Sequence, residues 1–175
     1  MKSLDIKPNS TIPQIRTFEA IVLLRACLFL GITTEALMLG EKLLQAALSA
    51  NNPRNLIVIN LLLAQIHRKQ GDVVEALDKL DRALAEAHEH GYVQMVVDEG
   101  AALSVLLKQY RKQRRLKDYP ELREFSGMIA KAIPKDEIYD AASSPITASL
   151  TRQENRVFQL LVSAVRLICC SSSSR

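Results

Sequence analysis

The 175-residue sequence is poor in aromatic residues, which make up 5% of the chain and include no tryptophan. It also has only 6 glycines and 6 prolines, too few for a fold built from many short strands and turns. Apolar residues still make up 48% of the chain, with leucine and alanine prominent. A core of this kind predicts helices packed on helices rather than a β-sandwich.

Cysteine is scarce, with three residues at Cys27, Cys169 and Cys170. One isolated and two adjacent cysteines form neither a disulfide framework nor a zinc-binding spacing, so we expect Cys27 in the core and a reducing, cytoplasmic setting. No apolar run reaches the roughly 18 residues of a membrane span. Residues 1–13 lack the apolar stretch of a signal peptide, and we therefore expect no membrane association.

The net charge of +4 is unevenly distributed, because residues 108–117 alone hold six lysines and arginines. Such a run could contact nucleic acid or act as a targeting patch. Tyr110 lies too early in the run to interleave with the later charges. We favour the simpler interpretation, a solvated turn between helices.

Residues 57–90 show the clearest pattern in the chain, two amphipathic helices joined at Gly71 and Asp72. The glycine can adopt the left-handed conformation that ends a helix, and the aspartate can cap the next one. Alanines on the facing sides allow close approach of the two helices, with leucines filling the space around them. The alanines are Ala64, Ala76 and Ala83, and the leucines are Leu63, Leu80 and Leu84.

An earlier segment repeats this pattern, because Gly31 precedes Gly71 by 40 residues and Leu23, Ala36 and Leu44 align with apolar positions of the second copy. We expect Thr33 or Thr34 to cap its second helix. A third, weaker unit is predicted to begin with one helix over residues 91–110 and to continue in a helix that starts near Pro120. The repeats resemble tetratricopeptide (TPR) repeats, although their period exceeds the usual ~34 residues.

The predicted fold is therefore all-α, a TPR-like superhelix of helical hairpins with repeats of about 40 residues. The chain divides into five segments by composition and periodicity. These are a polar lead-in over 1–13, the helical repeats over 14–133, a linker over 134–149, a single helix over 150–164 and a serine-rich tail over 165–175.

The helix over 150–164 resembles the start of a LuxR-type helix-turn-helix domain. The matching residues are Leu150, Thr151, Glu154, Val157, Leu160 and Leu161. Upstream, residues 91–93 and 97–100 are similar to the end of the helical-repeat region in large MalT-like regulators of the same family. Those regulators combine an ATPase domain, a helical superhelix that senses an inducer, and a LuxR-type DNA-binding domain, and the order of segments here agrees with the last two.

The tail after Ala164 departs from that family, which continues with Ser-Asn-x-Glu-Ile-Ala and a recognition helix. Specific base reading needs such a helix in the major groove, so DNA is an expected partner only if a complete helix-turn-helix is present. The sequence thus resembles a fragment, or a frame-shifted product, of a MalT-like regulator. It has no GxxxxGK[ST] loop, so we expect no cofactor in this chain, and ATP is implied only for the absent ATPase domain of the resembled family.

The first helices of TPR hairpins usually line the concave face, and this predicts which side chains form a binding groove. By the repeat alignment they are Arg25, Gln65, Arg68, Lys69, Lys108 and Gln109. A polar, cationic groove suits an anionic small molecule or an acidic peptide. The alternative is a solvated helix face without a ligand.

Metal binding and catalysis are not expected. His67 stands at the position where the repeat usually has tyrosine, which indicates packing. His88 and His90 are two residues apart on a helix and point to different sides. The sequence offers no nucleophile with an adjacent base and no catalytic carboxylate pair, so we expect no enzyme.

Two functions remain compatible with these features. The first is the effector-sensing region of a LuxR-family, MalT-like transcription regulator, with a small-molecule inducer or a protein partner in the groove. The second is a stand-alone TPR-like adaptor for protein–protein interaction. Stacked repeats can also self-associate.

Overall fold

A computed structural model describes residues 17–99, 101–113 and 118–133 of the chain. Over these residues it contains α-helices and no strands, which confirms the expected all-α fold. The helices are α1 (Thr17–Leu30), α2 (Thr33–Ser49), α3 (Pro53–Gln70), α4 (Val73–His90), α5 (Val93–Val97), α6 (Ala101–Tyr110) and α7 (Pro120–Ala132). The predicted lead-in over 1–13, linker over 134–149, helix over 150–164 and tail over 165–175 lie outside the described residues.

The first five helices are separated by turns that recur every 20 residues. The turn residues with positive φ are Gly31, Asn51, Gly71 and Gly91. At Gly71 and Gly91 φ is 85° and 70°, values that side-chain-bearing residues rarely adopt. The 40-residue repeat is therefore two helix-and-turn units of equal length, and this regularity keeps successive hairpins in register.

Side chains cap two of these helices. Asn52 Oδ1 accepts a 3.2 Å hydrogen bond from the backbone N–H of Asn55 at the start of α3. Asp72 Oδ1 accepts one of 3.2 Å from Glu75 N–H at the start of α4, as predicted from the sequence. The prediction for α2 was wrong, because its N-cap is Ile32 and no side chain bonds to the free N–H groups there.

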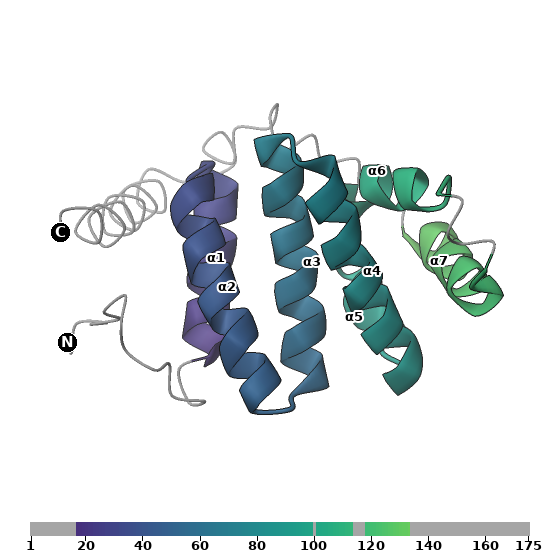
Figure 1. Ribbon diagram of the computed structural model, residues 1–175, viewed down its shortest axis with the longest axis horizontal. Helices are drawn as coiled ribbons and strands as arrows, with labels where there is room; N and C mark the ends of the chain where they lie inside the picture. The colour runs from purple at the N-terminus through teal and green to yellow at the C-terminus, as the bar shows by residue number, and fades with distance from the viewer. Residues whose placement is uncertain (1–16, 100, 114–117, 134–175) are drawn as a thin grey trace, which may run out of the picture.

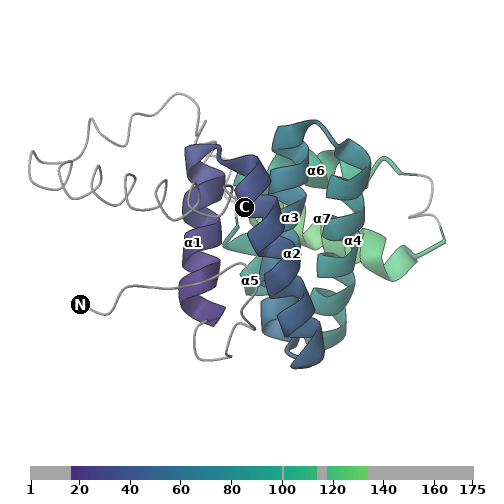
Figure 2. The same ribbon diagram turned by 60° about the vertical axis from the view of Figure 1, so that its left-hand side comes forward.

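Consecutive helices pack as hairpins, α1 with α2 and α3 with α4, and the hairpins stack through α2 against α3. Figure 1 shows this stack, with α6 and α7 closing the end that follows α4. Figure 2 shows α1 and α5 on the same side of the stack and α4 on the opposite side. The contacts run from α1 to α3 and from α3 to α5, so the first helices form a continuous row.

Two apolar cores share α3. One side of this helix contributes Ile57, Leu61 and Ala64 to a core with α4, α6 and α7. Another side contributes Leu56, Ile59, Leu62, Leu63 and Ile66 to a core with α1 and α2, which also holds Cys27 as expected. Eleven residues of α3 are buried, and this makes it the central element of the stack.

The three alanines predicted at the α3–α4 contact are fully buried there, together with Leu80 and Leu84. Leu63 does not join them as predicted, because it lies in the other core against Gly40 of α2. Adjacent positions on a helix differ by about 100° in direction, so one step in the sequence decides which neighbour a side chain meets.

The third unit is divided where the sequence predicts one helix over residues 91–110. The structure has the five-residue helix α5, a turn at Asp98 and Glu99, and then α6. After this break α6 packs against α4 and α7. Residues 114–117 of the basic run lie outside the described residues, and α7 begins at Pro120 as expected. Within the described ranges, no helix has the length and apolar character needed to cross a membrane.

Candidate binding face on the first helices

The row of α1, α3 and α5 presents polar side chains from separate repeats on one surface, here termed the first-helix face. Arg25 of α1 and Gln65 of α3 are 40 residues apart and so occupy the same position of consecutive repeats. Glu99, in the turn after α5, meets both of them. Residues distant in the sequence thus form one polar cluster because the hairpins stack in register.

Glu99 accepts from both terminal nitrogens of Arg25. Arg25 Nη1 donates to Oε2 at 3.0 Å, and Nη2 donates to Oε1. Gln65 Nε2 donates to Oε2 at 3.4 Å. Only 7% of the Glu99 side chain is exposed, against 45% of that of Arg25. A carboxylate this buried needs compensating donors, and the two-pronged contact with arginine supplies them.

Lys69 and Arg68 lie about one turn further along α3 than Gln65, on the same side of the helix. Lys69 Nζ donates a 2.7 Å hydrogen bond to the backbone oxygen of Leu28, near the carboxyl end of α1. Partial burial, and secondarily the charge of Arg68, lower the pKa of Lys69 below its ordinary value of 10.5. Arg68 Nε is buried, and the described residues offer it no hydrogen-bond partner.

Four of the six residues predicted for the groove therefore lie on α1 and α3, and two of these meet directly at Glu99. Lys108 and Gln109 do not join them. Both are exposed on α6, after the break that turns this helix towards α4 and α7. Their alignment assumed an uninterrupted third helix, which the structure does not have.

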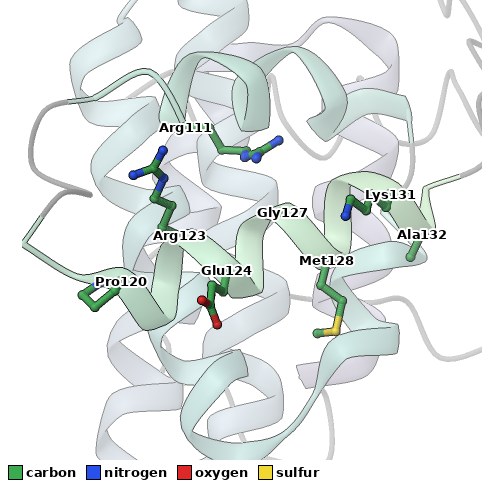
Figure 3. A pocket seen from close by; sticks show the side chains of 8 residues that line it. All are labelled: Arg111, Pro120, Arg123, Glu124, Gly127, Met128, Lys131 and Ala132. Carbon is green, nitrogen blue, oxygen red and sulfur yellow. The ribbon is translucent and has the colours of Figure 1, made fainter.

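Part of the basic run lines a separate hollow beside α7. The hollow has a volume of about 800 Å³, is open to solvent and carries Arg111, Arg123 and Lys131. Figure 3 shows Glu124 and Met128 pointing to the opposite side of α7 from Arg123. Gly127 lies beside the Arg111 guanidinium, and a methyl group there would be in ordinary van der Waals contact with Nη2, at 3.4 Å. An open hollow with a cationic rim lacks the enclosure typical of small-molecule sites.

Each of the three histidines lies beside a carboxylate or an aromatic ring. His67 is buried, as predicted for a packing position, and its Nδ1 lies 4.0 Å from Asp72 Oδ2. The His88 ring meets Phe125 edge-on, with centroids 5.2 Å apart, and His90 Nε2 lies 3.5 Å from Glu86 Oε2. Over the part of the chain that the structure describes, no three His, Cys, Asp or Glu side chains gather as a metal site would require.

Comparison with known families matches this architecture. The model of the MalT-like TPR region covers residues 3–113, more than half of the chain. The chain belongs to the MalT-like TPR region family. No curated protein and no solved structure gives a significant match. The match includes α1 to α6 and the whole Arg25–Gln65–Glu99 cluster, whereas α7 follows it.

Membership of the MalT-like TPR region family makes this a helical-repeat region of the interaction or sensor type. The site residue that sequence reasoning missed is Glu99. Its motif, residues 97–100, was noted only for its family resemblance. The one available signal was Glu99 itself, an acidic residue next to Gly100. Such a pair does not predict that Glu99 contacts Arg25, which lies 74 residues earlier in α1.

Proposed function

We propose that this MalT-like TPR region is the effector-sensing part of a LuxR-family transcription regulator, acting in the cytoplasm by binding rather than catalysis. The family match is the observation that carries the proposal. The order of segments supports it, since repeats over 14–133 are followed by a linker and by the Leu-Thr-x-x-Glu pattern of 150–164. The effector would bind at the first-helix face.

The charge of that face supports a polar or anionic effector. Arg25, Arg68 and Lys69 bring three cationic groups to it, and Glu99 brings one carboxylate. Long-range attraction raises the local concentration of anions at such a surface and speeds their association. An acidic segment of a protein partner would be attracted in the same way, as the adaptor function requires.

A thermal-stability screen of small molecules and acidic peptides against the folded chain tests where the effector binds. We expect effector binding to weaken in Arg68→Ala and Lys69→Ala, and to persist in Arg82→Ala, which removes the same charge from the outer helix α4. Small-molecule hits support the sensor, and peptide hits alone support the adaptor. If both α3 variants bind the effector like the unaltered chain, the first-helix face is not the sensor site.

The DNA-binding half of the proposal is tested by sequencing the coding region through and beyond codon 164 in all three frames. A frame that encodes Ser-Asn-x-Glu-Ile-Ala and a recognition helix would agree with a LuxR-type regulator. Absence of such a frame in the natural gene would contradict it and would favour the stand-alone adaptor.

A further inference from the structure

The Arg25–Glu99 pair joins hairpins that are not neighbours in the sequence. Arg25 belongs to α1 in the first hairpin, and Glu99 follows α5 in the third unit. Gln65 of α3, between these two helices, donates to the same carboxylate. The contact therefore spans the row of first helices, and its loss would free the turn after α5 from α1.

The donors on α1 and α3 form a receptor for a carboxylate. Gln65 is 8% exposed and the side chain of Glu99 is 7% exposed, so the amide and the carboxylate meet in partly buried surroundings. Arg25 contacts both carboxylate oxygens, an arrangement that is stronger and more directional than a single-nitrogen contact. The Arg25 side chain is 45% exposed and its contact with Glu99 lies at the surface, so a ligand can approach it from solvent.

The surrounding charge is not balanced by Glu99 alone. Lys69 is committed to the Leu28 carbonyl, a neutral acceptor, and Arg68 Nε is buried without a partner among the described residues. Partial burial, and secondarily the nearby charge of Arg68, lower the pKa of Lys69. A further anion on this side of α3 would be favoured by both cations.

We propose that Arg25 and Gln65 form a carboxylate-binding subsite which Glu99 occupies as an internal stand-in, and that a carboxylate-bearing ligand displaces Glu99 and so releases the link between the first and third units. The proposal rests on the proposed function and specifies the ligand chemistry and the regulation of the same face. Glu99 acts as a built-in competitor. Its occupancy of the subsite reduces the apparent affinity for any external carboxylate.

The test compares carboxylate binding by calorimetry in four forms of the chain. The probes are glutarate, a small dicarboxylate, and a penta-glutamate peptide with blocked ends. We expect Glu99→Gln to bind a probe at least about tenfold more tightly than the unaltered chain, because the competitor has lost its charge. Arg25→Gln, alone or combined with Glu99→Gln, should abolish this binding.

A matched control separates the subsite from a general change in charge. Glu89→Gln alters the net charge equally, at an exposed position of the outer helix α4, and should change probe affinity less than about twofold. Equal gains in Glu99→Gln and Glu89→Gln would overturn the proposal, as would undiminished binding by Arg25→Gln. Binding of glutarate supports a small-molecule effector, and binding of the peptide alone supports an acidic protein segment.

A second measurement keeps the proposal falsifiable if Glu99→Gln fails to fold. In the unaltered chain with ¹³C-labelled glutamate, saturating probe should shift the Glu99 carboxyl resonance as it leaves Arg25. An unshifted Glu99 resonance with bound probe would overturn the displacement. An effector that binds the first-helix face with the same affinity in the unaltered chain, in Glu99→Gln and in Arg25→Gln would refute only this inference. Effectors that bind elsewhere would refute the proposed function itself.

Discussion

Gly40 lies inside α2 where that helix crosses Leu63 of α3. A methyl group on residue 40 would lie 2.6 Å from Leu63 Cδ2 and 3.2 Å from its Cγ. Leu63 is fully buried, so it has little freedom to yield. Gly40 is the repeat equivalent of Leu80 in the next hairpin, 40 residues later. Because glycine is so much smaller than leucine, Leu63 can enter the core that α3 forms with α1 and α2.

We therefore expect Gly40→Ala to destabilise the protein by about 1 kcal/mol, since overpacking outweighs the gain in helix propensity. Leu63→Ala alone should cost about 2–5 kcal/mol by leaving a cavity. In the Leu63→Ala background, Gly40→Ala should become neutral or stabilising, because the new methyl group fills vacated space. Urea unfolding of the four forms measures the coupling, and strictly additive free energies would contradict this contact.

The lowered pKa of Lys69 predicts a pH dependence with a defined sign. Burial and Arg68 disfavour the charged lysine in the folded state, so the folded chain binds fewer protons than the unfolded chain between the lowered pKa and 10.5. The contribution of Lys69 to the free energy of unfolding should therefore rise with pH across that window. Below the lowered pKa this contribution should stay constant at its lower value. An NMR titration of the Lys69 side chain measures the pKa directly.

In that titration Arg68→Ala should move the Lys69 midpoint upwards, towards 10.5, because one cause of the shift is removed. Lys69→Arg identifies the resonance. A Lys69 midpoint at or above 10.5 in the unaltered chain would be inconsistent with the burial and repulsion described for α3.

At the scale of elements, the α3–α4 hairpin depends on small residues at its contact. Ala64, Ala76 and Ala83 are all fully buried, and bulkier side chains would force the helices apart. We expect Ala83→Leu to destabilise the protein by about 1–3 kcal/mol through overpacking. The matched control is Ala85→Leu, on the exposed side of the same helix, which should change the unfolding free energy by less than about 0.5 kcal/mol.

The two variants are compared by chemical denaturation followed by circular dichroism. Equal effects at positions 83 and 85 would mean that α3 and α4 do not approach through their alanines.

The α3–α4 hairpin was the best predicted part of the fold. Gly71, Asp72 and the alanine spacing are local signals, and each acts within one or two turns of helix.

Elements whose ends depend on distant contacts were less predictable. The apolar spacing over 91–110 is interrupted at Asp98, Glu99 and Gly100, but one glycine and two acidic residues inside a helical pattern do not by themselves predict the break between α5 and α6. Thr33 and Thr34 are good capping residues by type, but the helix begins at Thr33, so both lie inside it and Ile32 is the N-cap. Leu63 was assigned to the wrong core because the helical pattern alone does not say which neighbour lies opposite.

At the scale of the whole molecule, α3 joins two cores and α1, α3 and α5 align their polar side chains on one face. The 40-residue repeat predicted that Arg25 and Gln65 would share a face, because equivalent positions align in a stack. The repeat could not predict the contacts of Glu99, because they depend on how the third unit packs against α1 and α3. The site was thus half predictable, from repetition, and half a product of tertiary packing.

The measurement that tests the central claim most directly is an NMR chemical-shift map of the chain titrated with the first effector that raises its melting temperature. We expect the largest shifts on the first-helix face, at Arg25, Gln65, Lys69 and Glu99. Shifts concentrated on α2 and α4, or in the hollow beside α7, would contradict the claim that this face is the functional surface.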